Sequence, residues 1–542
     1  MPYVHAIEKH IMSTSITAPP IFASDMVKFQ QSDVEALMDH YDLSEDVKHL
    51  IREENLLPVS LITRLHNSFP QHSLFKWKSE LIFSKGKTKY SGLAGFRKIC
   101  EILGQHGIVL SHIKERELFV EVYAFLATRH ILNTIDWNDY QQDPVFQLVF
   151  PQPNMIDKAV VEEYSRIEDD EERMKMVVEY RNQTNPHDGK QILNRPSFYS
   201  EEGKFEAVDG GQHKYPQVFL LFDKTTQGCY AYCTYCFRHA QLRGDEDMFI
   251  QDDVEQVLEY LRKHKEVTDI LITGGDAGYM PYSRLYEYLN PIMEDPELMH
   301  IRNIRIASRA LTYQPGVVLD TKYDDVLAFF NKLINHGIQV IWMAHFSTPK
   351  EFLNINTLAA IRRLRKHQIN IRSQSPMMNH ISLFTDDRGK VDIDRSAQNW
   401  IDLGHILMML GINFHSIYCA RPTGEHDYFT APLADMDKIF SKVYRSLPSL
   451  GRPSRYITMT SSAGKTSLMG TVEVNGRKAF ALKFNEARNM DWLDRVYLAE
   501  FDEKENTIEK LKPFDGGEYF YKNELSRIED ELQDKYDMSL KE

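Results

Sequence analysis

GCYAYCTYCFRHAQLRGD, residues Gly228 to Asp245, holds three of the five cysteines in a chain of 542 residues. Cys229, Cys233 and Cys236 stand in a C-x3-C-x2-C spacing, whereas Cys100 and Cys419 lie far away in the sequence. Disulfides are typical of small secreted domains, and a structural zinc site normally takes four ligands in two separated pairs. A disulfide framework is disfavoured in so long a chain with its other two cysteines far away. A structural zinc site is disfavoured because there is no second C-x2-C pair. Three thiolates on one short loop suit an iron–sulfur cluster with one iron left open for another ligand.

Apolar runs of strand length alternate with amphipathic segments around and after this loop. VFLLF (Val218–Phe222) precedes the cysteines, and a helical pattern follows at Asp252–Glu266. The alternation continues to Leu447, through DILITGG, NIRIASR, IQVIWMAHF, INIRSQS and NFHSIYC. We count six β/α units, which predict an α/β fold with a parallel sheet and right-handed crossovers.

The cysteine spacing resembles the cluster motif of radical S-adenosylmethionine (SAM) enzymes, C-x3-C-x-aromatic-C, with Tyr235 as the aromatic residue. This resemblance implies a [4Fe–4S] cluster whose open iron is chelated by the amino and carboxylate groups of SAM. It also implies a partial (β/α)6 barrel with its chemistry at the strand ends. The SAM site that it implies comprises Tyr235, the GGD segment Gly274, Gly275 and Asp276, and, as weaker candidates, Ser308, Arg309 and Gln374.

A second motif is SSAGKTSLMG (Ser461–Gly470), which follows the predicted strand RYITMT and places Lys465 in a loop of small residues. A nucleotide-binding P-loop is disfavoured because Met459 stands where that motif needs its first glycine. A lysine among glycine, alanine and serine suits a Schiff base with pyridoxal phosphate (PLP), whose bulky ring needs small neighbours.

Together the two motifs resemble the lysine 2,3-aminomutase family of PLP-dependent radical SAM enzymes, over about Ile135 to Phe520. The resemblance implies that Lys465 bonds to PLP, that Lys214 and Tyr215 lie near its phosphate, and that Arg238 binds the substrate carboxylate. It implies an isomerase in which a 5′-deoxyadenosyl radical removes a hydrogen from an amino acid and nitrogen migrates from the α to the β carbon.

The sequence departs from the lysine-specific members at two positions. Those enzymes hold the distant ammonium of lysine with two aspartates. In this chain Ala420, directly after Cys419, and Thr458, seven residues before Lys465, stand at the matching places. A buried ammonium without a partner is costly, so we expect a glutamate-like or neutral amino acid rather than free lysine. Arg421 is a candidate to hold a side-chain carboxylate, although an exposed arginine is equally compatible with the sequence. The family's lysine enzymes often bind zinc through cysteines late in the chain. No cysteine follows Cys419 here, so the resemblance does not lead us to expect zinc.

Other functions stay open at this point. A lysine 2,3-aminomutase with relocated recognition groups would share the motifs. A radical SAM enzyme of another outcome, such as an epimerase or a deaminating enzyme, would share the barrel and the cluster. The Lys465 loop argues against a version of that enzyme without PLP. An iron–sulfur protein that senses redox state would need no SAM site, and failure to cleave SAM would support it.

Composition and charge limit the partners and the location. The formal net charge of −14 disfavours a nucleic-acid partner, and no apolar run or basic leader indicates a membrane span or signal peptide. We expect a cytoplasmic enzyme that forms a homo-oligomer, takes a small amino acid as substrate and receives electrons from a flavodoxin or ferredoxin.

Four regions are predicted along the chain. Residues 1–134 form a helical accessory region, with helices expected in SDVEALMDHYDL, SGLAGFRKICEILGQHG and ERELFVEVYAFLATRHIL. Residues 135–210 are a leading segment similar to that of the family. Residues 211–450 form the radical SAM barrel, and residues 451–542 carry the PLP lysine and a tail.

Overall fold

A sheet of eleven strands organises the chain. The structure, a computed structural model, describes residues 26–41, 43–72, 81–83, 87–185, 190–243, 248–421 and 428–541. The strand order in the sheet is β15-β14-β13-β12-β11-β10-β9-β8-β7-β6-β5. Strands β6 to β12 are parallel to their neighbours, whereas β5 and β13 to β15 pair antiparallel.

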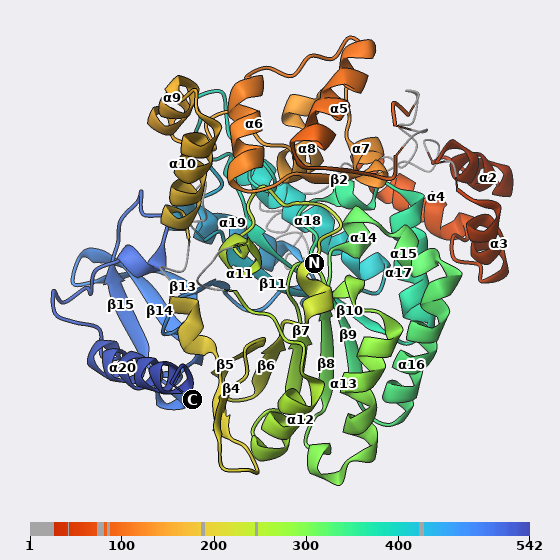
Figure 1. The fold of residues 1–542 in the computed structure, drawn as a ribbon. Coiled ribbons are helices and arrows are strands. Elements are labelled where there is room, and N and C mark those ends of the chain that lie inside the picture. Colours follow the sequence, from red (N-terminus) through yellow and green to blue (C-terminus); the bar gives the residue numbers. More distant parts are fainter. Residues whose placement is uncertain are drawn as a thin grey trace, which may run out of the picture.

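The parallel strands alternate with helices, as the sequence pattern predicts. The strands are β6 (Val218–Leu221), β7 (Asp269–Ile272), β8 (Asn303–Ala307), β9 (Gln339–Ala344), β10 (Asn370–Met377), β11 (Asn413–Cys419) and β12 (Ile457–Thr460). The helices between them are α12 (Val254–Lys263), α13 (Tyr282–Glu294), α16 (Asp324–Asn335), α17 (Ile355–Lys366), α18 (Ile393–Met409) and α19 (Leu433–Ser446). The protein is therefore a mixed α/β protein in which helices cover the outside of a parallel sheet (Figure 1).

Local sequence explains where these elements begin and end. Asp253 caps α12 by accepting a hydrogen bond from the amide of Gln256, and the helix buries Val257, Leu258 and Leu261 against the sheet. Helix α16 is followed by Gly337, whose φ of +91° suits a residue without a side chain. In β9 all residues after Gln339 are buried, as expected of a strand covered on both faces.

The N-terminal region is mainly helical and lies at the carboxyl ends of the parallel strands (Figure 1). Its helices are α2 (Gln31–His40), α3 (Glu45–Glu53), α4 (Val59–Ser68), α5 (Gly92–Gln105), α6 (Ile113–Val122), α7 (Arg129–Thr134), α8 (Pro144–Val149), α9 (Lys158–Arg166) and α10 (Asp170–Gln183). The prediction of one continuous helix over ERELFVEVYAFLATRHIL is wrong, because β2 (Leu126–Thr128) interrupts it and pairs with β1 (Lys89–Ser91). This pairing gives the backbone of residues 126–128 hydrogen-bond partners that compete with helix formation.

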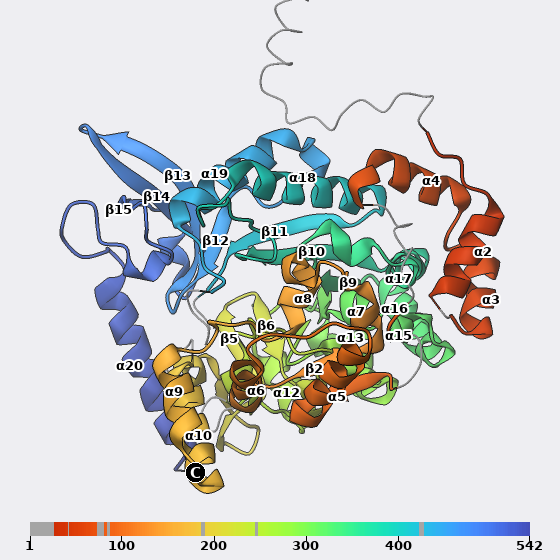
Figure 2. The same ribbon diagram turned by 90° about the horizontal axis from the view of Figure 1, so that it is seen from above.

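The C-terminal strands extend the sheet beyond β12. Strands β13 (Gly464–Val474) and β14 (Arg477–Ala487) form a long hairpin that projects from the rest of the sheet (Figure 2), and β15 (Val496–Glu500) completes it. The prediction that Lys465 lies in a loop is wrong. The amide of Ser461 donates to the carbonyl of Gly464 over 2.8 Å, which closes the turn so early that Lys465 is already a strand residue, paired with Thr460 and Glu486.

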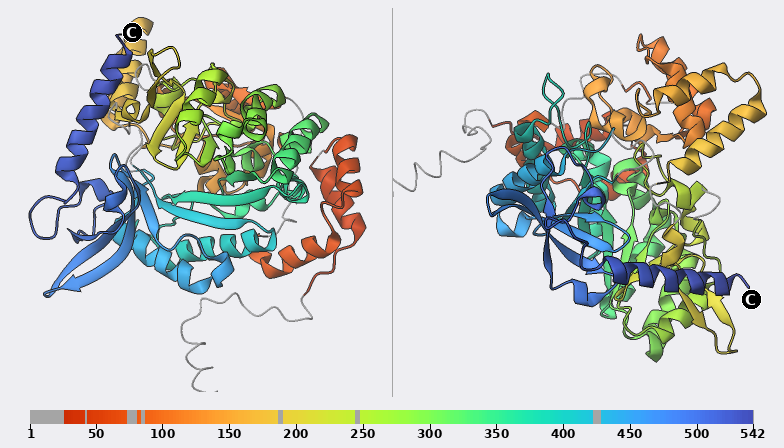
Figure 3. Two further views of the ribbon diagram at one scale, coloured as in Figure 1. Left: turned by 90° about the horizontal axis from the view of Figure 1, so that it is seen from below. Right: turned by 90° about the vertical axis from the view of Figure 1, so that its left-hand side faces the viewer.

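The remaining elements are short, except for the last helix. They are β3 (Ser197–Tyr199), β4 (Phe205–Ala207), β5 (Gly211–Tyr215), α11 (His239–Arg243), α14 (Ala310–Tyr313) and α15 (Gly316–Leu319). Helix α20 (Lys522–Ser539) contacts β3 and β4 and runs along one side of the molecule (Figure 3).

One hydrophobic cluster connects the described regions, from Leu37 in α2 to Leu525 in α20. The predicted boundaries at residues 134, 210 and 450 therefore stay predictions, since apolar contacts continue across them. None of the helices in the described part of the chain combines the length and apolar character that a bilayer crossing requires.

Candidate active site at the carboxyl ends of the parallel strands

A cavity of about 860 Å³ runs along the parallel strands, from first residues such as Val218, Asp269 and Asn303 to the loops that follow the strands. All residues that the sequence puts forward for the site line it: Cys229, Cys233, Cys236, Tyr235, Gly274, Gly275, Asp276, Ser308, Arg309, Gln374, Lys214, Tyr215, Arg238, Arg421 and Lys465. The fold thus brings together side chains separated by as many as 251 positions, from Lys214 to Lys465. Their individual roles stay predictions.

The cysteine loop leaves β6 and is held by the N-terminal region. The amide of Tyr232 donates to the carbonyl of Leu126 over 2.8 Å, and that of Thr234 to the carbonyl of Leu148 over 3.0 Å. The Thr234 hydroxyl donates to the carbonyl of Gln147, also over 2.8 Å. The break between α6 and α7 therefore serves the site, because it presents the Leu126 carbonyl to the loop.

Polar groups surround the sulfur of Cys233. The Tyr313 hydroxyl lies 3.0 Å from this sulfur, and a guanidinium nitrogen of Arg309 lies 3.7 Å from it. Hydrogen bonds of this kind orient a sulfur ligand, and thiolate is the form of cysteine that binds iron. Three soft sulfur ligands on one loop fit an iron–sulfur cluster better than they fit a hard cation.

The GGD segment lies directly against the cysteine loop. The Gly275 amide donates to the carbonyl of Thr226 over 2.8 Å, and a side chain at Gly275 would place its Cβ only 2.8 Å from Cys229 Sγ. Gly274 has a φ of +135°, which other residues rarely adopt. Only glycine fits at these two positions, so the backbone can approach both the cluster ligands and anything bound in the cavity.

The carboxylate of Asp276 is hydrogen-bonded to the loops that follow β7 and β8. It accepts hydrogen bonds from the amides of Gly278 and Arg309, over 2.8 and 2.9 Å. Burial nevertheless raises the pKa of Asp276 to about 6, and the hydrogen bonds from Ser308 and the two amides oppose this shift.

The other predicted SAM residues have defined partners. Arg309 pairs with buried Glu351 over 2.8 Å and also donates to the Tyr235 hydroxyl. Gln374 accepts a hydrogen bond from Tyr418 over 3.0 Å. Sequence reasoning missed Glu351, Tyr313 and Thr234, because none of them belongs to a local motif.

Arg238 lies two residues beyond the last cysteine. Its guanidinium stacks over the ring of Phe222 at 4.9 Å and donates to Gln241 over 3.0 Å. Burial lowers the pKa of Arg238 to about 10, and the nearby Cys236 opposes this shift. No carboxylate in the described part of the chain forms an ion pair with Arg238, so its charge is available for an anionic ligand.

Lys465 projects from β13 toward the same cavity. Its Nζ lies 2.7 Å from a carboxylate oxygen of Glu486 and 5.5 Å from the centre of the Tyr215 ring. Ala463 and Gly464 precede it, and a side chain at Gly464 would collide with the carbonyl of Glu486 at 2.2 Å. A primary amine beside small residues, facing an open volume, fits the attachment point of PLP.

The carboxylates that line the cavity already have partners. Asp269 pairs with Arg305 over 2.6 Å, Glu486 pairs with Lys465, and Asp276 accepts its two backbone hydrogen bonds. Ala420 and Thr458, also in the lining, carry no charge. Within the described residues, no lining carboxylate is left over for an ammonium group.

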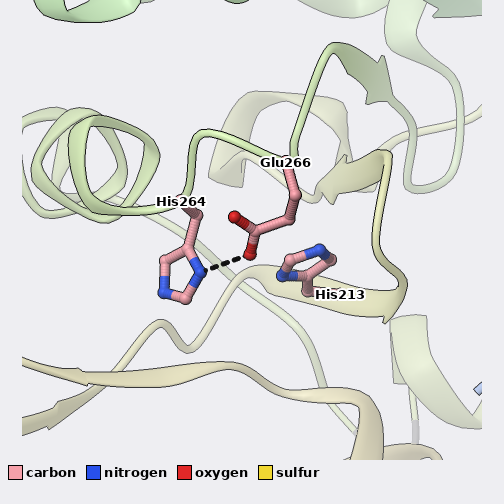
Figure 4. Close-up of side chains that lie close together, drawn as sticks. All are labelled: His213, His264 and Glu266. Atoms are coloured by element: carbon pink, nitrogen blue, oxygen red, sulfur yellow. Dashed lines mark hydrogen bonds and ion pairs between the residues drawn. The ribbon is translucent and has the colours of Figure 1, made fainter.

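A second group of possible metal ligands lies elsewhere, where β5 meets the end of α12 (Figure 4). His213, His264 and Glu266 have ligand atoms within 4.8 Å of one another. Both ring nitrogens of His213 are hydrogen-bonded within the protein, to the Tyr260 hydroxyl at 2.5 Å and to the Pro216 carbonyl at 3.0 Å. His264 is bonded to Glu266 over 2.8 Å. These hydrogen bonds connect the β5–β6 hairpin to α12 and the turn after it, which accounts for the close approach of the three side chains.

Known proteins similar to the chain carry one recurring name. A protein of Aquifex aeolicus named as a candidate L-lysine 2,3-aminomutase is 29% identical over 275 residues, covering 51% of this chain and 68% of that protein. The L-lysine 2,3-aminomutase of Fusobacterium nucleatum is 24% identical over 269 residues, 49% of this chain and 57% of that enzyme. The glutamate 2,3-aminomutase of Clostridioides difficile is 23% identical over 169 residues, 31% of this chain and 37% of that enzyme.

No protein-family model matches the chain. The names of the similar proteins, however, agree with the family that the two sequence motifs resemble. The chain is thus a distant relative of proteins named lysine 2,3-aminomutase and glutamate 2,3-aminomutase.

Proposed function

We propose that the protein is a radical SAM, PLP-dependent amino acid 2,3-aminomutase, whose parallel sheet is the partial barrel of that superfamily. The observation that carries the proposal is the shared cavity, in which the three loop cysteines and Lys465 line the same volume. A redox-sensing iron–sulfur protein would have no use for an amine placed among small residues beside its cluster. The names of the similar proteins favour amino-group migration over epimerisation or deamination.

The residues have separable tasks in this proposal. Cys229, Cys233 and Cys236 would hold the cluster, and the Gly274–Gly275 backbone would approach SAM. When bound, the cluster with SAM supplies a 5′-deoxyadenosyl radical, and PLP supplies an electron sink.

Two side chains would act on the substrate and on the amine. Arg238 would fix the carboxylate of the amino acid, which orients its β carbon. Glu486 forms an ion pair with the ammonium of Lys465 over 2.7 Å and would offer an acceptor for its proton when that amine becomes neutral to bond to a carbonyl carbon. The amino acid is the proposed small-molecule partner, with a flavodoxin or ferredoxin as electron donor.

The substrate is proposed to be an α-amino acid other than lysine, with a neutral or glutamate-like side chain. Of the carboxylates that line the cavity in the described residues, Asp269 and Asp276 keep their partners, and Glu486 gives up its own only when Lys465 bonds to PLP. A lysine ammonium elsewhere in the cavity would therefore have no carboxylate to meet. Leaving a buried charge unpaired costs several kcal/mol by general rules for buried ions. A cost of this size is enough to disfavour lysine against a neutral or glutamate-like amino acid. The same cavity contains cations without a carboxylate partner, which suits an anionic rather than a cationic ligand.

Borohydride reduction tests the central part of this proposal. The protein, incubated with PLP, reduced and digested, should carry the reduced cofactor on Lys465, and Lys465→Ala should carry none. Lys214 provides an internal control because it is a second amine in the same cavity. A label on Lys214, or no label on the wild-type protein, would remove the assignment.

A further inference from the structure

We propose that Tyr313 and Arg309 raise the reduction potential of the cluster through the sulfur of Cys233. Glu351 is the positioning residue that holds Arg309 for this task. The inference rests on the proposed function, since it needs a cluster on the cysteine loop. It assigns Arg309 to the cluster, whereas the resemblance to radical SAM enzymes suggests this residue for the SAM pocket.

The Tyr313 hydroxyl is the first observation. It lies 3.0 Å from the sulfur of Cys233, and the residue is buried. A cysteine sulfur bonded to iron has no proton, so of these two groups only the hydroxyl can then donate. The backbone holds Tyr313 in place, because its amide donates to the carbonyl of Arg309 over 2.8 Å and its carbonyl accepts from the Thr128 hydroxyl over 2.5 Å.

The guanidinium of Arg309 is the second observation. Its Nη1 lies 3.7 Å from the sulfur of Cys233 and also donates to the Tyr235 hydroxyl. Its plane of charge lies over the Tyr313 ring, 4.5 Å from the ring centre. The backbone amide of Arg309 donates to Asp276 over 2.9 Å, so main chain and side chain are both fixed. A positive charge is thereby held against one of the three predicted cluster ligands.

Glu351 determines how this charge is oriented. Its carboxylate receives Nη2 of Arg309 over 2.8 Å and the amides of Ser347 and Thr348 over 2.5 and 3.0 Å. A buried ion pair adds little to stability by itself, because the cost of removing two charges from water offsets their attraction. Orientation explains this pair better: Arg309 meets the sulfur with one terminal nitrogen and the carboxylate with the other.

A hydrogen-bond donor and a cation at a ligand sulfur favour the reduced cluster. Reduction adds one electron, and with it one negative charge, and hydrogen bonds to the sulfurs are among the features that set the potential of an iron–sulfur cluster. Such interactions are stronger in the protein interior than in water. Tyr313 and Arg309 should therefore make the cluster easier to reduce, and the loss of either should make it harder to reduce.

The test is a redox titration of the reconstituted protein, in which electron paramagnetic resonance reports the reduced cluster. Tyr313→Phe keeps the ring beneath Arg309 and removes only the donor. It should shift the reduction equilibrium up to about tenfold toward the oxidised cluster, which is about 59 mV for one electron. Tyr260→Phe is the matched control, because it removes a buried hydroxyl that contacts His213, and it should leave the potential unchanged.

Glu351→Gln gives a second measurement with the opposite sign. It removes the negative charge that partly cancels Arg309, so it should shift the equilibrium toward the reduced cluster. A merely structural role would not give opposite shifts in Tyr313→Phe and Glu351→Gln. Iron content is measured first in every variant. If Glu351→Gln does not hold iron, the comparison of Tyr313→Phe with Tyr260→Phe decides.

Other outcomes have distinct meanings. An unchanged potential in Tyr313→Phe with full iron content would overturn the inference and leave the proposed function standing. Shifts of the same sign in Tyr313→Phe and Glu351→Gln, or an equal shift in Tyr260→Phe, would overturn it too. Nε of Arg309 has no partner among the described residues, so Arg309→Lys is tested for SAM affinity by calorimetry. Weaker SAM binding with an unchanged potential would return Arg309 to the SAM pocket. Failure of the wild type to hold a cluster would instead refute the proposed function.

Discussion

At the scale of single residues, the three loop cysteines differ from Cys100 and Cys419 in their surroundings. The three loop cysteines line the cavity, and Tyr313 and Arg309 lie beside Cys233. Cys419 also lines the cavity, but it lies at the end of β11, and burial raises the pKa of its thiol. Cys100 lies in α5, where burial raises the pKa of its thiol to about 11. A thiol with a raised pKa is a poor iron ligand at neutral pH. Their shared loop, rather than their number, makes these three cysteines the candidate ligands of the cluster.

Cys233→Ala should therefore abolish the cluster. Anaerobic reconstitution with iron and sulfide should give about four irons per wild-type chain, since that is the content of a [4Fe–4S] cluster, and close to none in the variant. Cys100→Ala is the control and should bind iron like the wild type. Full iron content in Cys233→Ala would show that the loop does not hold the cluster.

The buried carboxyl of Asp276 predicts a dependence of stability on pH. Its pKa is raised from 3.8 to about 6, so the folded protein binds a proton here before the unfolded chain does. The penalty that ionised Asp276 places on folding is complete above about pH 6, declines as the pH falls, and disappears near pH 3.8.

Asp276→Asn removes this titration. As the pH falls from 7 to 5, the wild type should gain about 1 kcal/mol relative to the variant, measured by thermal melting of the apo-protein at each pH. A constant difference between the two proteins would mean that folding does not shift the pKa of Asp276, and a change of opposite sign would mean that folding lowers it.

At the scale of elements, the N-terminal helices hold the cysteine loop in place. Thr234 provides the test because its hydroxyl donates to the carbonyl of Gln147 over 2.8 Å. Thr234→Val keeps the shape of the side chain but loses this hydrogen bond, at a cost of about 1 kcal/mol.

The loop in Thr234→Val should release iron to a chelator several times faster than in the wild type, roughly the effect of 1 kcal/mol on a rate. Thr321→Val, an exposed threonine in a turn before α16, is the control. Equal rates of iron release from all three proteins would show that the N-terminal region does not hold the cluster loop in place.

The elements also show what sequence could and could not predict. Period and composition located β6 to β11 and the helices between them, because most of these strands are short runs rich in apolar residues that alternate with helical patterns. The break before β2 could not be read locally, since it depends on pairing with β1 and on the hydrogen bond to Tyr232. Lys465 was found by its small neighbours, but its place on β13 depends on the partner strands β12 and β14.

The same distinction holds within the site. Cys229, Cys233, Cys236 and Lys465 belong to motifs and could be found from the sequence. Glu351 and Thr234 act through contacts with residues far away in the chain, Arg309 and Gln147, so only the folded structure shows that they support the site.

At the scale of the whole molecule, a single cavity joins the cluster loop on β6 to the lysine on β13, at opposite parts of the sheet. The helical region covers the strand ends, and the C-terminal strands supply the amine. In this arrangement a radical formed at the loop and an amino acid bonded near Lys465 would share one enclosed volume, as a migration of nitrogen requires.

The most direct test of this account is the product formed from a panel of α-amino acids. The reconstituted protein is supplied with SAM, PLP and a strong reductant, and each reaction is examined by NMR for the β-amino isomer. We expect the isomer from a neutral or acidic amino acid, little or none from free lysine, and none from any substrate with Lys465→Ala. Cleavage of SAM without a β-amino product from any member of the panel would contradict the account.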